Sequence, residues 1–212
     1  MWRFRNRVVA VAVIAGSLIA LKLFLWPVFV WLVATRRFKA TAGGLVAGAI
    51  LILAPWALIG FAGLSGYPHL LNVMSRVERS TGYTIPALLS GGLSWRSAEL
   101  VGIAVGTAVL AAMVWLGRRH ERRSFALAIA ATLSLTPVFS LNYYVFLVVV
   151  LALLTPSLNW AWALPLLFWL SPQVGNGMTW QTALALVVGA GTVALAMRGR
   201  PVAGRGRSVA TS

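Results

Sequence analysis

Long apolar segments separated by short clusters of arginine occupy most of this 212-residue chain. Hydrophobic residues make up 60% of it and charged residues only 10%, whereas about 25% of a soluble domain is charged. A water-soluble fold of this size could not bury that much apolar surface, because its own surface is large relative to its volume. The sequence therefore predicts an all-α, polytopic integral membrane helix bundle.

The basic clusters predict how the segments are oriented. Positive residues beside apolar spans are enriched on the cytoplasmic side of a membrane. The net charge of +15 is carried by such clusters and not by a polar face, which argues against nucleic-acid binding. We expect a multi-pass protein of the cytoplasmic (inner) membrane of a bacterium, with both termini in the cytoplasm. The clusters are Arg3/Arg5/Arg7, Arg36/Arg37/Lys39, Arg118/Arg119/Arg122/Arg123 and Arg198/Arg200/Arg205/Arg207.

The apolar segments predict about eight transmembrane or half-membrane helices in a single domain, residues 1–197. Several are shorter than the roughly 20 residues of a simple span, which is tolerated where neighbouring helices cover them or where they line a wet cavity. Residues 198–212 are basic and contain glycine, so we expect a disordered cytoplasmic tail. The segments are Val8–Ala34 (counted as two), Thr41–Phe61, Ala98–Leu116, Ser124–Thr136, Tyr143–Leu154, Trp160–Leu170 and Trp180–Met197.

The first segment, Val8–Ala34, is too long for one comfortable span and is interrupted by Lys22 and Pro27. Arginines flank both of its ends. If both arginine clusters are cytoplasmic, the segment forms a hairpin of two short helices with Lys22 at the opposite membrane surface. One long kinked helix is the alternative, and it places the N-terminus outside.

The longest polar interruption, residues 62–97, is the outer loop of this topology. Lysine binds phosphate as a point charge and arginine as a planar fork. We therefore expect Lys22, Arg76 and Arg79 to bind the phosphate of a lipid carrier. For Lys22 the alternative is that its amine snorkels to the lipid headgroups. These three and Arg96 are the cations that the topology leaves on the outer side.

The same loop holds Glu78, the candidate general base, although a solvated ion pair with a neighbouring arginine also explains it. Glu99 is accounted for by capping and the helix dipole, and Glu121 lies in a basic cluster where we expect a structural role. His69 could contact a sugar or a phosphate, and an ordinary loop histidine is the alternative.

A second polar break separates two apolar segments at Thr136–Asn142. Aromatic faces stack on sugar rings and amides hydrogen-bond hydroxyls, so Asn142, Tyr143 and Tyr144 are the predicted sugar or acceptor contacts. The alternative is a turn formed by Pro137 and Asn142, with both tyrosines anchored at the membrane interface.

Metal and thiol chemistry have little support. The chain has no cysteine, which excludes disulfides, iron–sulfur clusters and thiolate zinc sites. Its two histidines and three acidic residues, none of them aspartate, leave little for a metal cage. We expect no metal and no cofactor.

Two stretches resemble the GT-C membrane glycosyltransferases, and most closely glycosyltransferase family 87, also catalogued as domain of unknown function 2029. In ALKLFLWPVFVWLVATRRFKA the shared pattern is Lys22, Pro27 and Arg36–Arg37–Phe38. The second stretch, LSLTPVFSLNYYVFLVVVLALL, is similar to the family's break between two apolar helices. It differs in having Thr136 before the proline, and Asn142–Tyr143–Tyr144 where a tryptophan and a histidine often stand.

This resemblance, over roughly residues 10–170, implies a mannosyltransferase-like enzyme with a GT-C-like fold. Such an enzyme transfers a hexose, typically mannose, from a polyprenyl-phosphate carrier to a glycolipid or glycan on the outer face. The lipid-linked sugar is a substrate, and membrane lipid surrounds the protein.

The family places its acidic base in an outer loop near the N-terminus, whereas Glu78 is the first acidic residue here. Three explanations remain open: the chain is the C-terminal part of a split enzyme whose N-terminal half is encoded separately, Glu78 is the base, or the chain is inactive alone. Outside the enzyme class, a non-catalytic multi-pass subunit and a small transporter are the alternatives.

Overall fold

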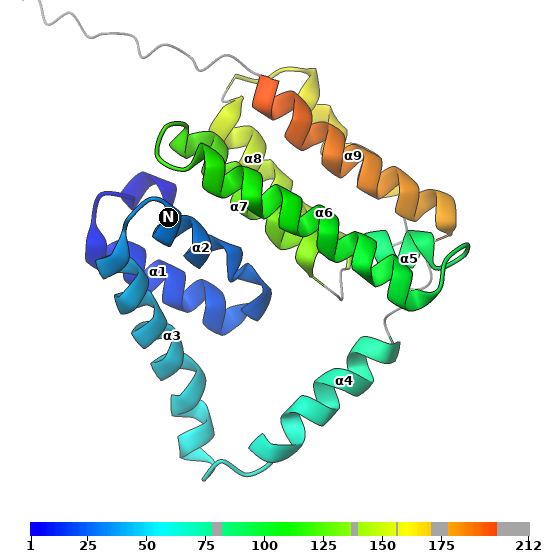
Figure 1. Ribbon diagram of the computed structural model, residues 1–212. Helices are drawn as coiled ribbons and strands as arrows, with labels where there is room; N and C mark the ends of the chain where they lie inside the picture. Colours follow the sequence, from blue (N-terminus) through cyan, green and yellow to red (C-terminus); the bar gives the residue numbers. More distant parts are fainter. Residues whose placement is uncertain (78–81, 137–139, 156, 171–177, 199–212) are drawn as a thin grey trace, which may run out of the picture.

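The computed structural model describes residues 1–77, 82–136, 140–155, 157–170 and 178–198, and within these ranges every regular element is a helix (Figure 1). The predicted all-α membrane bundle is confirmed, and each of the eight predicted segments holds a helix. The α-helices are α1 (Val8–Leu21), α2 (Pro27–Ala34), α3 (Phe38–Leu58), α4 (Tyr67–Val77), α5 (Ile85–Leu89), α6 (Trp95–Leu116), α7 (Glu121–Leu135), α8 (Phe146–Leu154) and α9 (Thr179–Arg198). The 3-10 helices are η1 (Trp2–Phe4), η2 (Leu23–Leu25), η3 (Leu64–Gly66), η4 (Leu141–Val145) and η5 (Trp160–Leu170).

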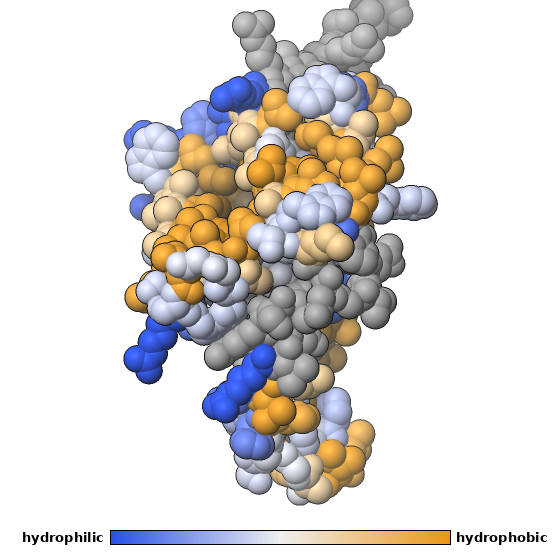
Figure 2. All heavy atoms as spheres, turned by 90° about the vertical axis from the view of Figure 1, so that its right-hand side faces the viewer, coloured by the Kyte–Doolittle hydropathy of each residue, from blue (hydrophilic) through white to orange (hydrophobic). Residues whose placement is uncertain are grey.

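Three helices of the described chain, α3, α6 and α9, are long and apolar enough to cross a membrane. Their outward side chains are large and apolar, for example Leu53 on α3 and Ile103 on α6, which are about half exposed. Figure 2 shows hydrophobic side chains spread over the body of the face that it presents. Such a surface is stable against lipid and not against water.

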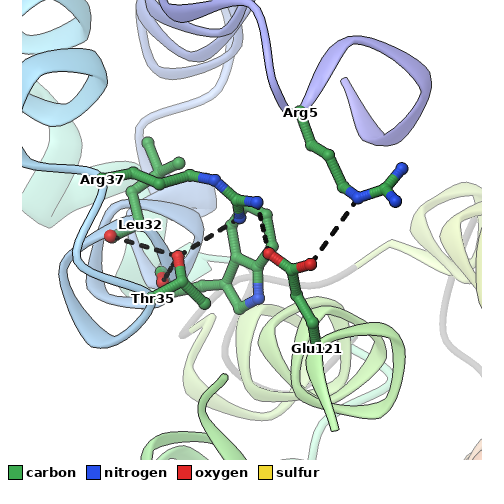
Figure 3. A network of polar contacts seen from close by, with 6 residues as sticks. Arg5, Leu32, Thr35, Arg37 and Glu121 are labelled. Atoms are coloured by element: carbon green, nitrogen blue, oxygen red, sulfur yellow. Dashed lines mark hydrogen bonds and ion pairs between the residues drawn. The ribbon is translucent and has the colours of Figure 1, made fainter. Parts of the chain in front are cut away.

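The segment Val8–Ala34 is a hairpin, as the arginine clusters predict. Lys22 ends α1 in an extended conformation, and α2 starts at Pro27, whose fixed φ suits the first turn of a helix. The two arms return to the same place, because Arg5 before α1 and Arg37 after α2 both pair with the carboxylate of Glu121 (Figure 3). We call this part of the bundle the Glu121 end, and the opposite part, where α1 stops, the Lys22 end.

Glycine sets the distance between α1 and α3. Gly44 and Gly48 form a small-xxx-small pair on α3, and Gly16 of α1 lies against them. A Cβ built on Gly16 would lie 2.8 Å from both the Gly44 carbonyl oxygen and the Gly48 nitrogen, so the helix backbones are nearly in contact. The small residues therefore let α1 and α3 pack closely.

The other helices form a second group that meets the first through α2 and α7 (Figure 1). α6 and α7 are antiparallel neighbours, and the buried Ser124 hydroxyl donates to the Met113 carbonyl oxygen at 2.8 Å. α8 packs between α7 and α9, and η5 lies along α9. At the junction of the two groups Trp31 is fully buried with its ring 4.8 Å from that of Phe125.

One prediction needs correction: residues 62–97 are not simply a loop. They contain α4, α5 and the first turn of α6. Helix α5 is capped by Thr84, whose hydroxyl oxygen accepts from the Ala87 N–H, and α6 by Ser94, whose hydroxyl accepts from the Ser97 N–H. Hydropathy did not predict α4 because its apolar residues alternate with polar ones, and it did not predict α5 because that helix has only five residues.

Glu121 joins three parts of the chain at its end of the bundle. Arg5 lies 3.6 Å from one carboxylate oxygen and Arg37 pairs with the other, while the Arg37 guanidinium stacks on Trp31 with 4.9 Å to the ring centroid. In Figure 3 the carboxylate points between the two arginines. Its structural role, expected from the sequence, is confirmed.

Glu121→Gln should therefore destabilise the bundle. Removing the charge leaves two half-buried arginines without their counterion, which costs on the order of 1 kcal/mol in partly exposed surroundings. We expect a fall in apparent melting temperature of about 3 °C in detergent. The matched control is Glu99→Gln, because Glu99 is exposed on α6. Equal melting temperatures for the two variants would contradict the role assigned to Glu121.

Candidate functional site

Lys22 is held in the turn between α1 and α2 at the Lys22 end. Because α1 stops at Leu21 and Pro27 begins α2, the intervening residues form the single turn η2. The side chain of Lys22 is half-buried. The lysine and the following proline thus produce a reversal of the chain with one cation at its tip.

The structure brings Lys22 together with Tyr143, a second predicted site residue. The Lys22 Nζ donates to the Tyr143 hydroxyl oxygen at 3.0 Å and lies 4.4 Å from the centroid of the same ring. The Phe24 ring packs on Tyr143 with centroids 4.9 Å apart. An ammonium group carries three N–H donors, so a phosphate oxygen can bind to Lys22 beside Tyr143. We call Lys22, Phe24 and Tyr143 the lysine–tyrosine site.

Tyr144, the next residue, faces the opposite side of η4. It is buried, its ring stacks on Phe168 at 4.5 Å, and its hydroxyl donates to the Tyr83 carbonyl oxygen at 3.3 Å. Tyr144 thereby fastens η4 to the residues before α5 and to η5. Asn142, on the same short helix, is exposed.

The lysine–tyrosine site is recessed below the ends of the long helices. Gly106 of α6 lies against Leu135, the last residue of α7. The N-terminal part of α6, about eleven residues or roughly 16 Å of helix, therefore extends beyond the end of α7. Helix α3 also extends beyond Lys22. Gly48 of α3 contacts Ile19 of α1, which lies just before Lys22, and α3 continues from Gly48 to Leu58, so its end lies roughly 10 Å past the level of Lys22. Lys22 is thus recessed relative to the ends of α3 and α6, and its predicted place at the membrane surface stays a prediction. A cation at that depth is costly, and the Tyr143 hydroxyl and ring offset part of the cost.

A cavity of about 480 Å³ lies on the Tyr144 side of η4. Its walls come from α5 to α9 and are almost wholly apolar, with residues such as Val109, Leu147 and Val193. Thr84, Ser134 and Tyr144 supply its hydroxyl groups. The short helix η4 therefore separates a cationic site from an apolar cavity.

The remaining predicted site residues are placed elsewhere. His69 and Arg76 are exposed on α4, and Arg76 Nε donates to the Asn72 side-chain oxygen at 2.9 Å. In the described part of the chain, neither residue bonds to Lys22 or Tyr143. Glu78 and Arg79 lie outside the described residues, as does Pro137. Their predicted roles stay predictions.

Three aromatic or polar partners were missed by sequence reasoning: Phe24, Tyr83 and Phe168. Phe24 is two residues from Lys22, so its place beside Lys22 could have been predicted from the sequence. Tyr83 and Phe168 lie far from Tyr144 in the sequence, so only the folded chain shows that they surround it.

Carboxylates are scarce at the Lys22 end. Of the three in the chain, Glu121 is paired with arginines at the other end of the bundle. Glu99 is exposed on α6, past its first turn. The lysine–tyrosine site therefore has groups that can bind an anion, and no carboxylate of the described residues forms an ion pair with Lys22.

Comparison with known proteins supplies a family. The model of glycosyltransferase family 87 matches residues 1–140, about two thirds of the chain, including the hairpin that presents Lys22. No curated protein and no solved structure is similar enough to add to this match. The resemblance stated from Lys22, Pro27 and the Arg36–Arg37 turn is thus confirmed at the level of the family. The chain belongs to glycosyltransferase family 87.

Proposed function

We propose that the chain acts in a membrane glycosyltransferase that transfers a hexose from a polyprenyl-phosphate carrier to a glycolipid or glycan. Mannose is the sugar to test first. In this proposal the Lys22 end faces outward from the cytoplasmic membrane of a bacterium, and the Glu121 end, with its arginines, faces the cytoplasm.

The observation that carries the proposal is the recessed lysine–tyrosine site. A lipid-linked phosphate is an anion attached to an apolar chain, so its site needs a cation within reach of the membrane interior. Lys22 is such a cation, since it lies roughly 10 Å below the end of α3.

The reaction needs a base and a stabilised leaving group. The base takes the proton of the acceptor hydroxyl, whose oxygen bonds to the anomeric carbon of the sugar as the bond from that carbon to the phosphate oxygen breaks. The electron pair of the broken bond stays on the phosphate, and polyprenyl phosphate leaves. Lys22 stabilises the charge that develops on this leaving group.

The base is Glu78 or a carboxylate of a second polypeptide. Glu78 follows directly after α4 in the sequence. A separately encoded N-terminal half, the other source, would carry the acidic outer loop that the family resemblance implies.

The test is sugar transfer from a radiolabelled polyprenyl-phosphate mannose in membranes that contain the chain, with and without the product of the upstream reading frame. Glu78→Gln is assayed in both settings. If the chain alone transfers sugar and Glu78→Gln abolishes that transfer, the base belongs to this chain. Transfer only with the upstream product makes the chain the carrier-binding half of a two-part enzyme. No transfer in either setting overturns the proposal in favour of a non-catalytic subunit or a transporter.

A further inference from the structure

Helix α4 is amphipathic, whereas the three long helices α3, α6 and α9 are apolar over most of their length. On a helical wheel of 100° per residue, Leu70, Val73 and Met74 share one face of α4, and His69, Asn72 and Arg76 share the other. No acidic residue lies between Tyr67 and Val77. The helix is therefore apolar on one side and polar to cationic on the other.

The apolar face of α4 is exposed. Leu70, Val73 and Met74 have 53%, 43% and 52% of their surface accessible, and the main packing partner of α4 in the described chain is the short helix η3. Three adjacent large apolar side chains left in water would be unfavourable. The face needs an apolar environment that the described residues do not supply.

The position of α4 indicates which environment that is. Phe61 and Gly63, both at positive φ, turn the chain sharply after α3, and α4 then runs across from the end of α3 towards α5 (Figure 1). Leu58, the last residue of the long apolar helix α3, is 88% exposed. The apolar surface of α4 therefore begins where the lipid-facing surface of α3 ends.

Aromatic and charged groups at the junction fit the same environment. The rings of Trp56 on α3 and Tyr67 on α4 meet edge to face, with centroids 5.8 Å apart. Tryptophan and tyrosine favour the boundary between lipid tails and headgroups. On the polar face of α4, Arg76 supplies a positive charge that attracts anionic lipid.

We infer that α4 is an interfacial helix, bound in the headgroup region of the bilayer that α3 spans, on the side of the Lys22 end. Its apolar face enters the membrane by about 5–10 Å, as such helices do, and its polar face contacts headgroups and water. The partner is the lipid surface. This inference does not depend on the proposed function, because it concerns any bilayer in which the folded chain resides.

Because the chain has no cysteine, single-cysteine variants can be spin-labelled without other changes. Leu70→Cys, Val73→Cys and Met74→Cys report on the apolar face, and His69→Cys and Asn72→Cys on the polar face. Each full-length variant is reconstituted into vesicles of phosphatidylethanolamine and phosphatidylglycerol. Electron paramagnetic resonance then measures how often each spin label collides with two reagents. One is oxygen, which is concentrated in lipid, and the other is a water-soluble nickel chelate. Leu53→Cys on α3 is the lipid reference and His120→Cys, at the Glu121 end, is the water reference.

We expect the ratio of oxygen to nickel collision to rise and fall with the helical period. The three apolar-face labels should approach the Leu53 value and the two polar-face labels the His120 value. Nickel access equal on both faces would place α4 in water and overturn the inference. Low access to both reagents at Leu70, Val73 and Met74 would also overturn it, since the face would then be covered by protein, such as a second copy of the chain.

Discussion

Lys22→Met should lower the rate of sugar transfer about 100-fold in whichever preparation shows transfer. The substitution keeps an unbranched side chain but removes the only amine at the lysine–tyrosine site, so the phosphate loses a charge-assisted hydrogen bond in a recessed position. Bonds of this kind contribute about 1.5–3 kcal/mol, and the effect is greatest where charge develops in the transition state. The measurement is the initial rate of transfer from polyprenyl-phosphate mannose.

The chain offers a matched control for this substitution. Lys39 is its only other lysine, and it is exposed at the start of α3, near the Glu121 end. Lys39→Met should leave the rate within about twofold. Tyr143→Phe keeps the ring and removes the hydroxyl, so we expect a smaller loss of about fivefold. A rate for Lys22→Met above one third of the original would show that another cation binds the carrier phosphate.

Gly16→Ala should destabilise the bundle by about 2 kcal/mol. Its new methyl group would lie 2.8 Å from backbone atoms of Gly44 and Gly48, and 2.7 Å from the Ala47 methyl, so α1 and α3 have to separate. Separation forfeits the contacts that hold two apolar helices together in lipid, where no hydrophobic effect drives them together. The free energy of unfolding can be measured by titration with sodium dodecyl sulfate from mixed micelles.

The control is the same change at Gly191 of α9, where a Cβ would meet no atom within 4 Å. Alanine is the better helix former at both positions by about 1 kcal/mol, so the difference between the two variants isolates the helix contact. We expect Gly191→Ala to be neutral or slightly stabilising. Equal free energies for the two variants would show that α1 and α3 are not closely packed in the membrane.

Much of the architecture was predictable because hydropathy and charge are local properties of the sequence. The apolar runs gave the eight helical segments, and the arginine clusters predicted the hairpin that Glu121 closes by pairing with Arg5 and Arg37. The lysine followed by a proline marked the turn of that hairpin. Each of these patterns is contained in a window of a few tens of residues, so no knowledge of distant contacts was needed.

The candidate site was predictable in composition but not in assembly. Lys22 and Tyr143 were singled out separately, and their hydrogen bond joins residues 121 positions apart. Tyr143 and Tyr144 look equivalent in the sequence, yet one faces the lysine and the other is buried against Phe168. Consecutive residues of a short helix point in different directions, and only the neighbours on each side decide which one is accessible.

The sequence by itself determined that this chain is a membrane helix bundle, because lipid selects for apolar helices, and it predicted that most of the arginines lie on one side. The tertiary structure decided the depth of Lys22, the partners of Glu121 and the exposure of α4. Depth and exposure depend on where helices of unequal length end relative to one another. Those levels are set by contacts such as Gly16 with Gly48 and Gly106 with Leu135, which link distant parts of the chain.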